Sequence, residues 1–163
     1  MSAIDEVLRN NTAYATSFDS GDLGAPPARR LAVLTCMDAR LDPARILGIK
    51  DGDAHVIRNA GGVVSEDAIR SLLISQRLLG TREILLMHHT DCGMLSFRDD
   101  DVKEQVLADT GLRPAFALEA FGDLEQDVRQ SIRRIEANPF IVHKDVIRGF
   151  VYDVATGELS EVT

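Results

Sequence analysis

Two stretches of this sequence have the same pattern of residues: LAVLTCMDAR at residues 31–40 and EILLMHHTDCG at residues 83–93. Each begins with an apolar, β-prone run and ends in a polar segment that carries one of the chain's two cysteines. We expect the apolar runs to form neighbouring parallel strands of one sheet. Since ligands of such sheets bind beyond the carboxyl ends of the strands, both polar segments are expected at one site there.

Short strands alternate with helices along the rest of the chain. Strands are predicted at residues 31–35, 54–58 and 83–88, helices at 4–18, 42–48, 65–79 and 123–137, a weaker helix at 99–108, and a hairpin at 148–154 and 158–162. This order predicts an α/β fold: a mainly parallel central sheet flanked by helices, with a C-terminal antiparallel edge strand. We expect residues 1–163 to form a single domain, with residues 1–28 as an N-terminal helical arm.

Composition and charge narrow the classes of function. Apolar residues make up 45% of the chain and charged residues 27%, which is ordinary for a globular protein, and the formal net charge is −8. Nucleic acid and anionic membrane surfaces both require a basic face, so neither is expected as a partner. We see neither a secretory signal nor an apolar run long enough to span a membrane, and we therefore expect a cytoplasmic location.

Cys36, His89 and Cys92 are candidate ligands of a metal ion. Two thiolates and an imidazole suit Zn²⁺, and three protein ligands leave a fourth position open, as in catalytic zinc sites. Two alternatives remain open: the cysteines pack as small hydrophobic side chains, or they form one disulfide. The polar and glycine-containing segments around both cysteines favour metal binding, and the absence of an export signal disfavours a disulfide.

Asp38 and Arg40 follow the first cysteine closely and form a candidate catalytic pair. The plainer interpretation is a surface ion pair, worth at most about 1 kcal/mol when exposed. On an extended loop the two side chains can instead face the metal together. Asp38 would then either bind zinc as a fourth ligand or accept a hydrogen bond from a zinc-bound water, with Arg40 holding it off the metal.

The remaining histidines and the glycine-rich segment have ordinary interpretations. His88 should point away from His89 in an extended segment and is expected to be packed or to lie behind the ligands. His55 and His143 are expected to be ordinary residues, although either could carry protons near neutral pH. Residues 59–62, NAGG, lack the pattern of a phosphate-binding loop and are expected to form a tight turn that lets the backbone approach the site.

The two motifs together resemble the signature of the β-class carbonic anhydrases, C-x-D-x-R followed by H-x-x-C-G. The matching residues are Cys36, Asp38, Arg40, His89, Cys92 and Gly93. The segment RNAGG at residues 58–62 is similar to the glycine-rich stretch that the family has between its motifs, and the likeness extends over residues 30–155. The short chain and reduced N-terminal arm look most like the small actinobacterial members of the family.

The resemblance implies a carbonate dehydratase, a lyase that reversibly hydrates CO₂ to bicarbonate and a proton. It implies Cys36, His89 and Cys92 as ligands of one Zn²⁺ per chain, with attack on CO₂ by zinc-bound hydroxide. The resemblance also implies Asp38 and Arg40 as a catalytic dyad. From the residues themselves we expect that Asp38 can become the fourth ligand in a closed form when its pair with Arg40 breaks. The resemblance also implies an obligate homodimer, with two dimers able to pair into a tetramer and with the active sites at the dimer interface.

Three other functions remain open at the level of sequence. Hydrolases of carbonyl sulfide or carbon disulfide resemble β-carbonic anhydrases and keep the same ligands. A zinc-stabilised binding or oligomerisation module would also contain the metal but would have no turnover. A thiol-redox role is disfavoured because the chain has no C-x-x-C pair.

Overall fold

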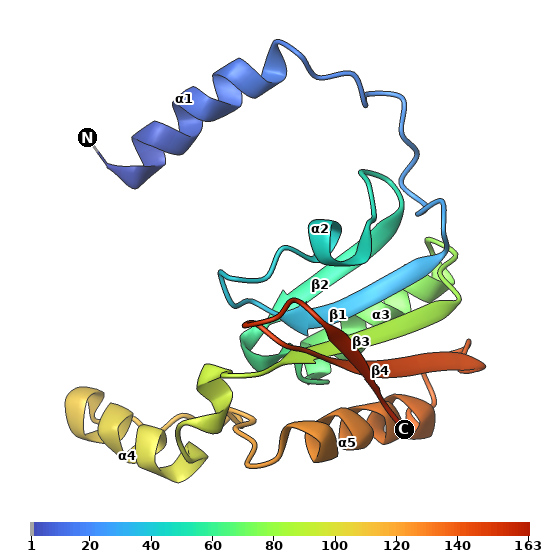
Figure 1. Ribbon diagram of the computed structural model, residues 1–163. Helices are drawn as coiled ribbons and strands as arrows, with labels where there is room; N and C mark the ends of the chain where they lie inside the picture. The colour runs from blue at the N-terminus through green and yellow to red at the C-terminus, as the bar shows by residue number, and fades with distance from the viewer. Residues whose placement is uncertain (1) are drawn as a thin grey trace.

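The chain folds around a five-stranded sheet, and the computed structural model describes residues 2–163 (Figure 1). The strands are β1 (Leu31–Cys36), β2 (Ala54–Asn59), β3 (Glu83–His89), β4 (Val146–Tyr152) and β5 (Leu159–Val162). Their order across the sheet is β2-β1-β3-β4-β5. The first four strands are parallel, and β5 pairs antiparallel with β4 at the edge. The predicted α/β fold class is confirmed.

Helices connect the strands, and their ends follow local capping signals. The α-helices are α1 (Ala3–Ala15), α2 (Pro43–Leu47), α3 (Glu66–Arg77), α4 (Asp99–Thr110) and α5 (Leu124–Ala137), and the 3₁₀-helices are η1 (Ala60–Gly62) and η2 (Gly93–Leu95). The side chains of Asp42, Ser65 and Asp123 accept hydrogen bonds from the first turns of α2, α3 and α5, as expected of N-caps. Helix α1 ends at Ala15, earlier than the predicted residue 18.

Helices α3 and α5 pack on one face of the sheet and bury the main core. Alternate residues of β1 and β3 point into this layer because side chains alternate between the faces of a strand. The buried members of the core are Ala32, Leu34, Val64, Ala68, Leu72, Ile84, Leu86, Ile135 and Ile141. With this face filled, the carboxyl ends of β1 and β3 are held side by side, and the motif loops leave the sheet there.

Helix α1 is an arm that stands away from the sheet (Figure 1). None of its residues from Ala3 to Ala15 is buried, although Ile4, Val7 and Leu8 form an apolar stripe and are 69%, 59% and 62% exposed. An amphipathic helix normally covers such a stripe by packing. Within residues 2–163, none of the helices combines the length and hydropathy that a membrane crossing requires.

Candidate metal centre

Cys36, His89 and Cys92 meet at the carboxyl edge of the sheet, as the spacing of the motifs predicts. Strands β1 and β3 pair in parallel, with Thr35 opposite Met87, so Cys36 and His89 end neighbouring strands. The ligand-capable atoms of the three side chains lie within 4.8 Å of one another, and all three residues are buried. Both cysteines are free thiols. The cluster could therefore hold a metal ion.

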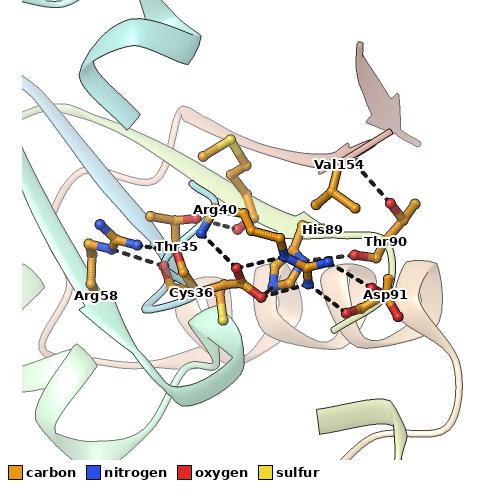
Figure 2. A network of polar contacts seen from close by, with 10 residues as sticks. Thr35, Cys36, Arg40, Arg58, His89, Thr90, Asp91 and Val154 are labelled. Carbon is orange, nitrogen blue, oxygen red and sulfur yellow. Dashed lines mark hydrogen bonds and ion pairs between the residues drawn. The ribbon is translucent and has the colours of Figure 1, made fainter. Parts of the chain in front are cut away.

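The loop after β3 is held by hydrogen bonds to the next strand (Figure 2). The Thr90 N–H donates to the Tyr152 carbonyl at 2.9 Å, and the Thr90 hydroxyl accepts from the Val154 N–H at 3.0 Å. On the other side, the Thr35 hydroxyl donates to the Met87 carbonyl at 2.8 Å. These contacts fix the backbone on both sides of His89 before any metal is bound.

Gly62 allows the 59–62 segment to lie directly against the first ligand. Its φ is +70°, and a Cβ atom there would lie 2.9 Å from the Cys36 backbone nitrogen. A larger residue would be strained in this conformation and would push the backbone of Cys36 away. The predicted tight turn that lets backbone approach the site is confirmed.

The hydrogen bonding of His89 leaves one ring nitrogen directed at the cysteines. Its Nδ1 lies 2.8 Å from the Thr90 carbonyl, which only accepts, so Nδ1 carries the proton and Nε2 has a free lone pair. Nε2 is buried and has no hydrogen-bond partner among residues 2–163. A buried acceptor without a partner is costly unless a ligand satisfies it. Metal-bound histidines commonly have this arrangement, so the site fits Zn²⁺.

The two thiols differ in acidity. Burial raises the pKa of Cys36, but a protonated His89 ring, as donor and positive charge, and the backbone at Asp38 and Gly61 outweigh burial and lower the pKa to about 7. Burial raises the pKa of Cys92 to about 11, with a further contribution from Cys36. Zinc binds cysteine as the thiolate, so binding to this pair releases protons.

Asp38 and Arg40 form a fork-shaped ion pair beside the cluster. Arg40 donates from Nε to Asp38 Oδ1 at 3.0 Å and from Nη2 to Oδ2 at 2.8 Å. These hydrogen bonds hold the pKa of Asp38 well below its ordinary value. Asp38 Oδ2 also lies 3.7 Å from His89 Nε2, so the carboxylate borders the candidate metal position.

The other histidines lie outside this cluster. His88 is fully buried, stacks on Phe121 and places Nε2 2.7 Å from Asp127 Oδ2, which confirms that it is a packed residue. His55 lies near the start of β2, with Nδ1 2.7 Å from the Ser75 hydroxyl, and His143 precedes β4. Both therefore lie toward the amino ends of the strands, away from the edge that carries the ligands.

Sequence reasoning missed two residues that support the motif loops. Arg58 donates from Nε to the Cys36 carbonyl at 2.9 Å and from Nη2 to the Asp38 carbonyl at 2.8 Å. Asp91 accepts from Arg40 Nη1 at 2.7 Å. The only local signal for either residue is its place beside a motif, because both contacts join segments distant in the chain.

Comparisons with known proteins agree with this geometry. A family model described as carbonic anhydrase matches residues 31–159. The chain is 60% identical over 163 residues to beta-carbonic anhydrase 1 of Mycobacterium tuberculosis, covering 100% of this chain and 99% of that protein. The crystal structure of carbonic anhydrase from Streptococcus mutans superposes with a TM-score of 0.94 at 41% identity, covering 100% of this chain and 99% of the other.

A relative with a different name is more distant. Carbon disulfide hydrolase from Acidianus is 37% identical over 160 residues, covering 83% of this chain and 78% of that protein. The full-length similarity is thus greatest to the carbonic anhydrases among these relatives. The chain therefore belongs to the β class of the carbonic anhydrases, the zinc-dependent enzymes that reversibly hydrate carbon dioxide to bicarbonate.

Proposed function

We propose that Cys36, His89 and Cys92 hold one zinc ion per chain and that CO₂ is hydrated beside it. The observation that carries this assignment is the buried Nε2 of His89, which has no hydrogen-bond partner within residues 2–163 and is directed at two free thiols in a member of a zinc-dependent family. Zinc bound here supplies a Lewis acid that makes a water molecule nucleophilic near neutral pH.

Asp38 and Arg40 are proposed to be the catalytic dyad. The fork of Arg40 keeps Asp38 ionised, so its carboxylate can accept a hydrogen bond from the attacking water and aim that water at the carbon of CO₂. The side chain of Asp38 is only 18% exposed, which limits competition from bulk water. In this structure Arg40 holds both carboxylate oxygens, an arrangement that would keep Asp38 from binding a zinc ion held by Cys36, His89 and Cys92.

Asp38 is also proposed as the fourth zinc ligand of a closed form. The distance of 3.7 Å between its Oδ2 and His89 Nε2 shows that the carboxylate is already close to the ligand set. Loss of the Arg40 contacts would free Asp38 to bind the metal and exclude water. The same residues would then give an active and a resting form of the enzyme.

The alternatives raised by the sequence receive less support. Hydrolysis of carbonyl sulfide or carbon disulfide would use the same ligands, but the 60% identical full-length relative is named a carbonic anhydrase, whereas the carbon disulfide hydrolase is 37% identical. A zinc-binding module without turnover would not need a carboxylate such as that of Asp38, which Arg40 holds in place beside the candidate ligands. We therefore assign the chain to CO₂ hydration.

We propose that the enzyme is a homodimer, with pairing into a tetramer as a further step. The exposed apolar stripe of α1 supports this, because a second copy of the chain would cover it. Strand β2 is an edge of the sheet, and an edge strand is a second kind of surface that can pair with another copy of the chain. We also propose a cytoplasmic location, supported by the two free thiols at a site suited to metal rather than a disulfide.

Stopped-flow CO₂ hydration at about pH 8.5, on protein of measured zinc content, tests this function, since zinc enzymes of this kind need a deprotonated water. We expect fast turnover at a stoichiometry near one zinc per chain. A fully zinc-loaded protein that hydrates CO₂ no faster than buffer would overturn the assignment. Carbonyl sulfide and carbon disulfide, tested on the same sample, would then identify a hydrolase.

A further inference from the structure

The guanidinium group of Arg40 is held on two edges by two different aspartates, and Figure 2 shows its contacts with Asp91. One edge, Nε and Nη2, donates to the two carboxylate oxygens of Asp38. The other edge donates from Nη1 to Asp91 Oδ2 at 2.7 Å and from Nη2 to the Asp91 backbone carbonyl at 2.9 Å. Arg40 therefore links the loop after β1 to the loop after β3.

Asp91 has an unusual backbone that presents both acceptors to Arg40. Its φ is +54°, in the left-handed region that few residues other than glycine adopt. Asp91 lies in the turn between His89 and Cys92, and the turn directs both its carbonyl and its carboxylate toward the first motif. Aspartate and asparagine are among the side chains that tolerate this conformation best.

Arg40 needs a second support if it is to keep Asp38 in one place. Its side chain is 47% exposed, and a long exposed side chain loses rotamer freedom when it forms an ion pair. The hydrogen bonds from Arg40 to Asp91, on the edge of the guanidinium away from Asp38, already restrict the side chain of Arg40. The fork can then hold Asp38 in a single orientation rather than in several.

We propose that Asp91 is a positioning residue that holds Arg40 in place and, through Arg40, orients the Asp38 carboxylate. This inference rests on the proposed role of Asp38 in CO₂ hydration. Asp91 does not face the ligand set itself, since its side chain is 80% exposed and its carboxylate binds the outer edge of Arg40. Its effect on the reaction is therefore indirect and falls on kcat rather than on KM.

Three substitutions separate the contributions of Asp91. Asp91→Asn keeps a side-chain acceptor and tolerates the positive φ. Asp91→Gly removes the side chain but relaxes the backbone, and Asp91→Ala removes the side chain and retains the strain. Asp101→Ala, an exposed aspartate in the first turn of α4, controls for the loss of one negative charge. All variants are compared as zinc-loaded protein of measured metal content.

Two readouts are measured on each variant: kcat and KM for CO₂ hydration, and the exchange rate of the Arg40 Nε–H with solvent by ¹⁵N NMR. We expect Asp91→Ala and Asp91→Gly to lower kcat about 10-fold at unchanged zinc content, the loss typical of removing a supporting hydrogen bond at a metal site. Exchange at Arg40 should be faster in both. Asp91→Asn should lie between these variants and the parent, and Asp101→Ala should match the parent.

Parent-like kcat and Arg40 exchange in both Asp91→Ala and Asp91→Gly would overturn the proposal. A fall in kcat without faster exchange at Arg40 would also overturn it, because Asp91 would then act by another route. Loss of zinc from both variants would also overturn the proposal. It would show that Asp91 stabilises the ligand-bearing loop after β3 and that its main role is not to hold Arg40. If the parent protein did not hydrate CO₂, the proposed function would be wrong. The exchange rate of the Arg40 Nε–H would still decide whether Asp91 holds Arg40.

Discussion

Asp38 Oδ2 lies 3.7 Å from His89 Nε2, and the same oxygen accepts a hydrogen bond from Arg40. A single carboxylate oxygen thus lies between a fixed cation and a free imidazole lone pair. The imidazole belongs to the last residue of β3, which is also the first residue of the second motif, whereas Asp38 and Arg40 belong to the first motif. The orientation of Asp38 relative to His89 is therefore the feature on which turnover should depend.

Replacing Asp38 by asparagine tests this dependence. Asp38→Asn preserves the size of the side chain but replaces one acceptor oxygen by an NH₂ group that cannot accept from Arg40 or from water. We expect turnover to fall by about 10- to 100-fold, in the range seen when a group supporting a metal site is removed, with zinc content unchanged. Parent-like CO₂ hydration in the zinc-loaded variant would exclude a role for Asp38.

Gly62→Ala tests the close approach of the 59–62 segment to Cys36. The added Cβ would be 2.9 Å from the Cys36 backbone nitrogen, at a φ of +70°. We expect the free energy of unfolding to fall by about 2 to 4 kcal/mol, from the left-handed conformation plus overpacking, and zinc affinity to fall with it. Urea unfolding and zinc titration measure the two effects.

Gly80→Ala is the matched control for that substitution. Gly80 has a φ of +75°, but a Cβ there would have nothing within 4 Å. The Gly80→Ala variant should lose only about 1 to 2 kcal/mol of its free energy of unfolding, which is the cost of the left-handed conformation, and should keep its zinc affinity. Equal losses of unfolding free energy and of zinc affinity in Gly62→Ala and Gly80→Ala would contradict a role for the close contact between Gly62 and Cys36.

Asp99 should contribute stability that depends on pH. Burial raises the pKa of this carboxyl, but hydrogen bonds from the backbone N–H groups of Ala120, Leu118 and Glu119 outweigh it and lower the pKa below its ordinary value of 3.8. Because the folded-state pKa is depressed, the contribution is fully present above pH 3.8 and is lost as the pH falls through the folded value. The three donors belong to the segment between α4 and α5.

Asp99→Asn should lower the free energy of unfolding at pH 7 by about 1 to 2 kcal/mol, since hydrogen bonds to a charged acceptor are lost. The difference from the parent should shrink as the pH falls below 3.8. Asp101→Asn, in the same first helical turn, should show little difference at any pH. Urea unfolding over a pH series measures both, and a difference that persists undiminished in acid would contradict the prediction.

Gly149 permits the contact between α5 and the sheet. It is buried in β4, and a Cβ atom there would overlap Val128 Cγ1 and lie 3.0 Å from Ile132 Cδ1. We expect Gly149→Ala to destabilise the fold by about 1 to 3 kcal/mol through overpacking. The double variant with Val128→Ala should lose less free energy of unfolding than the sum of the losses in the two single variants. The reason is that removing the Val128 methyl groups makes room for the methyl group added at Gly149. Strict additivity in urea unfolding would argue against direct contact.

The apolar stripe of α1 provides a test of dimer formation. Leu8 is 62% exposed within one chain, and a charge there should be excluded from an interface. We expect Leu8→Glu to shift a dimer toward monomer in sedimentation velocity at micromolar concentration. Asn10→Glu introduces the same charge two positions along the helix and should leave the dimer intact. Sedimentation of the parent as a monomer, or of Leu8→Glu as an unchanged dimer, would contradict the proposal.

Much of the fold was predictable from local signals in the sequence. The apolar runs of β1 and β3, the caps at Asp42 and Ser65, and the left-handed Gly48 after α2 depend on neighbouring residues, so the sequence alone specifies them. The end of α1 was not predicted correctly. The hydroxyl of Thr16 donates to the Ala13 carbonyl there, and such local hydrogen bonds compete with helix continuation.

The candidate ligands were also predictable, because residue type and spacing set the chemistry. Cys36 and His89 are the last residues of β1 and β3, and Cys92 lies in the loop after β3, so their meeting required only that the two strands be neighbours. That adjacency is a property of the sheet order β2-β1-β3, which joins segments distant in the chain and is not specified within either motif. The sequence suggested this neighbour relation without establishing it.

By itself the sequence determined the strands, the helix caps, the family signature and the types of side chain available to bind zinc. Only the tertiary structure decided which distant residues support them. Arg40 and Asp91 are 51 positions apart, and Gly149 meets Val128 across the layer between sheet and helix. Contacts of this kind depend on distances of a few ångströms between separately folded segments, and no local pattern of residues encodes such distances.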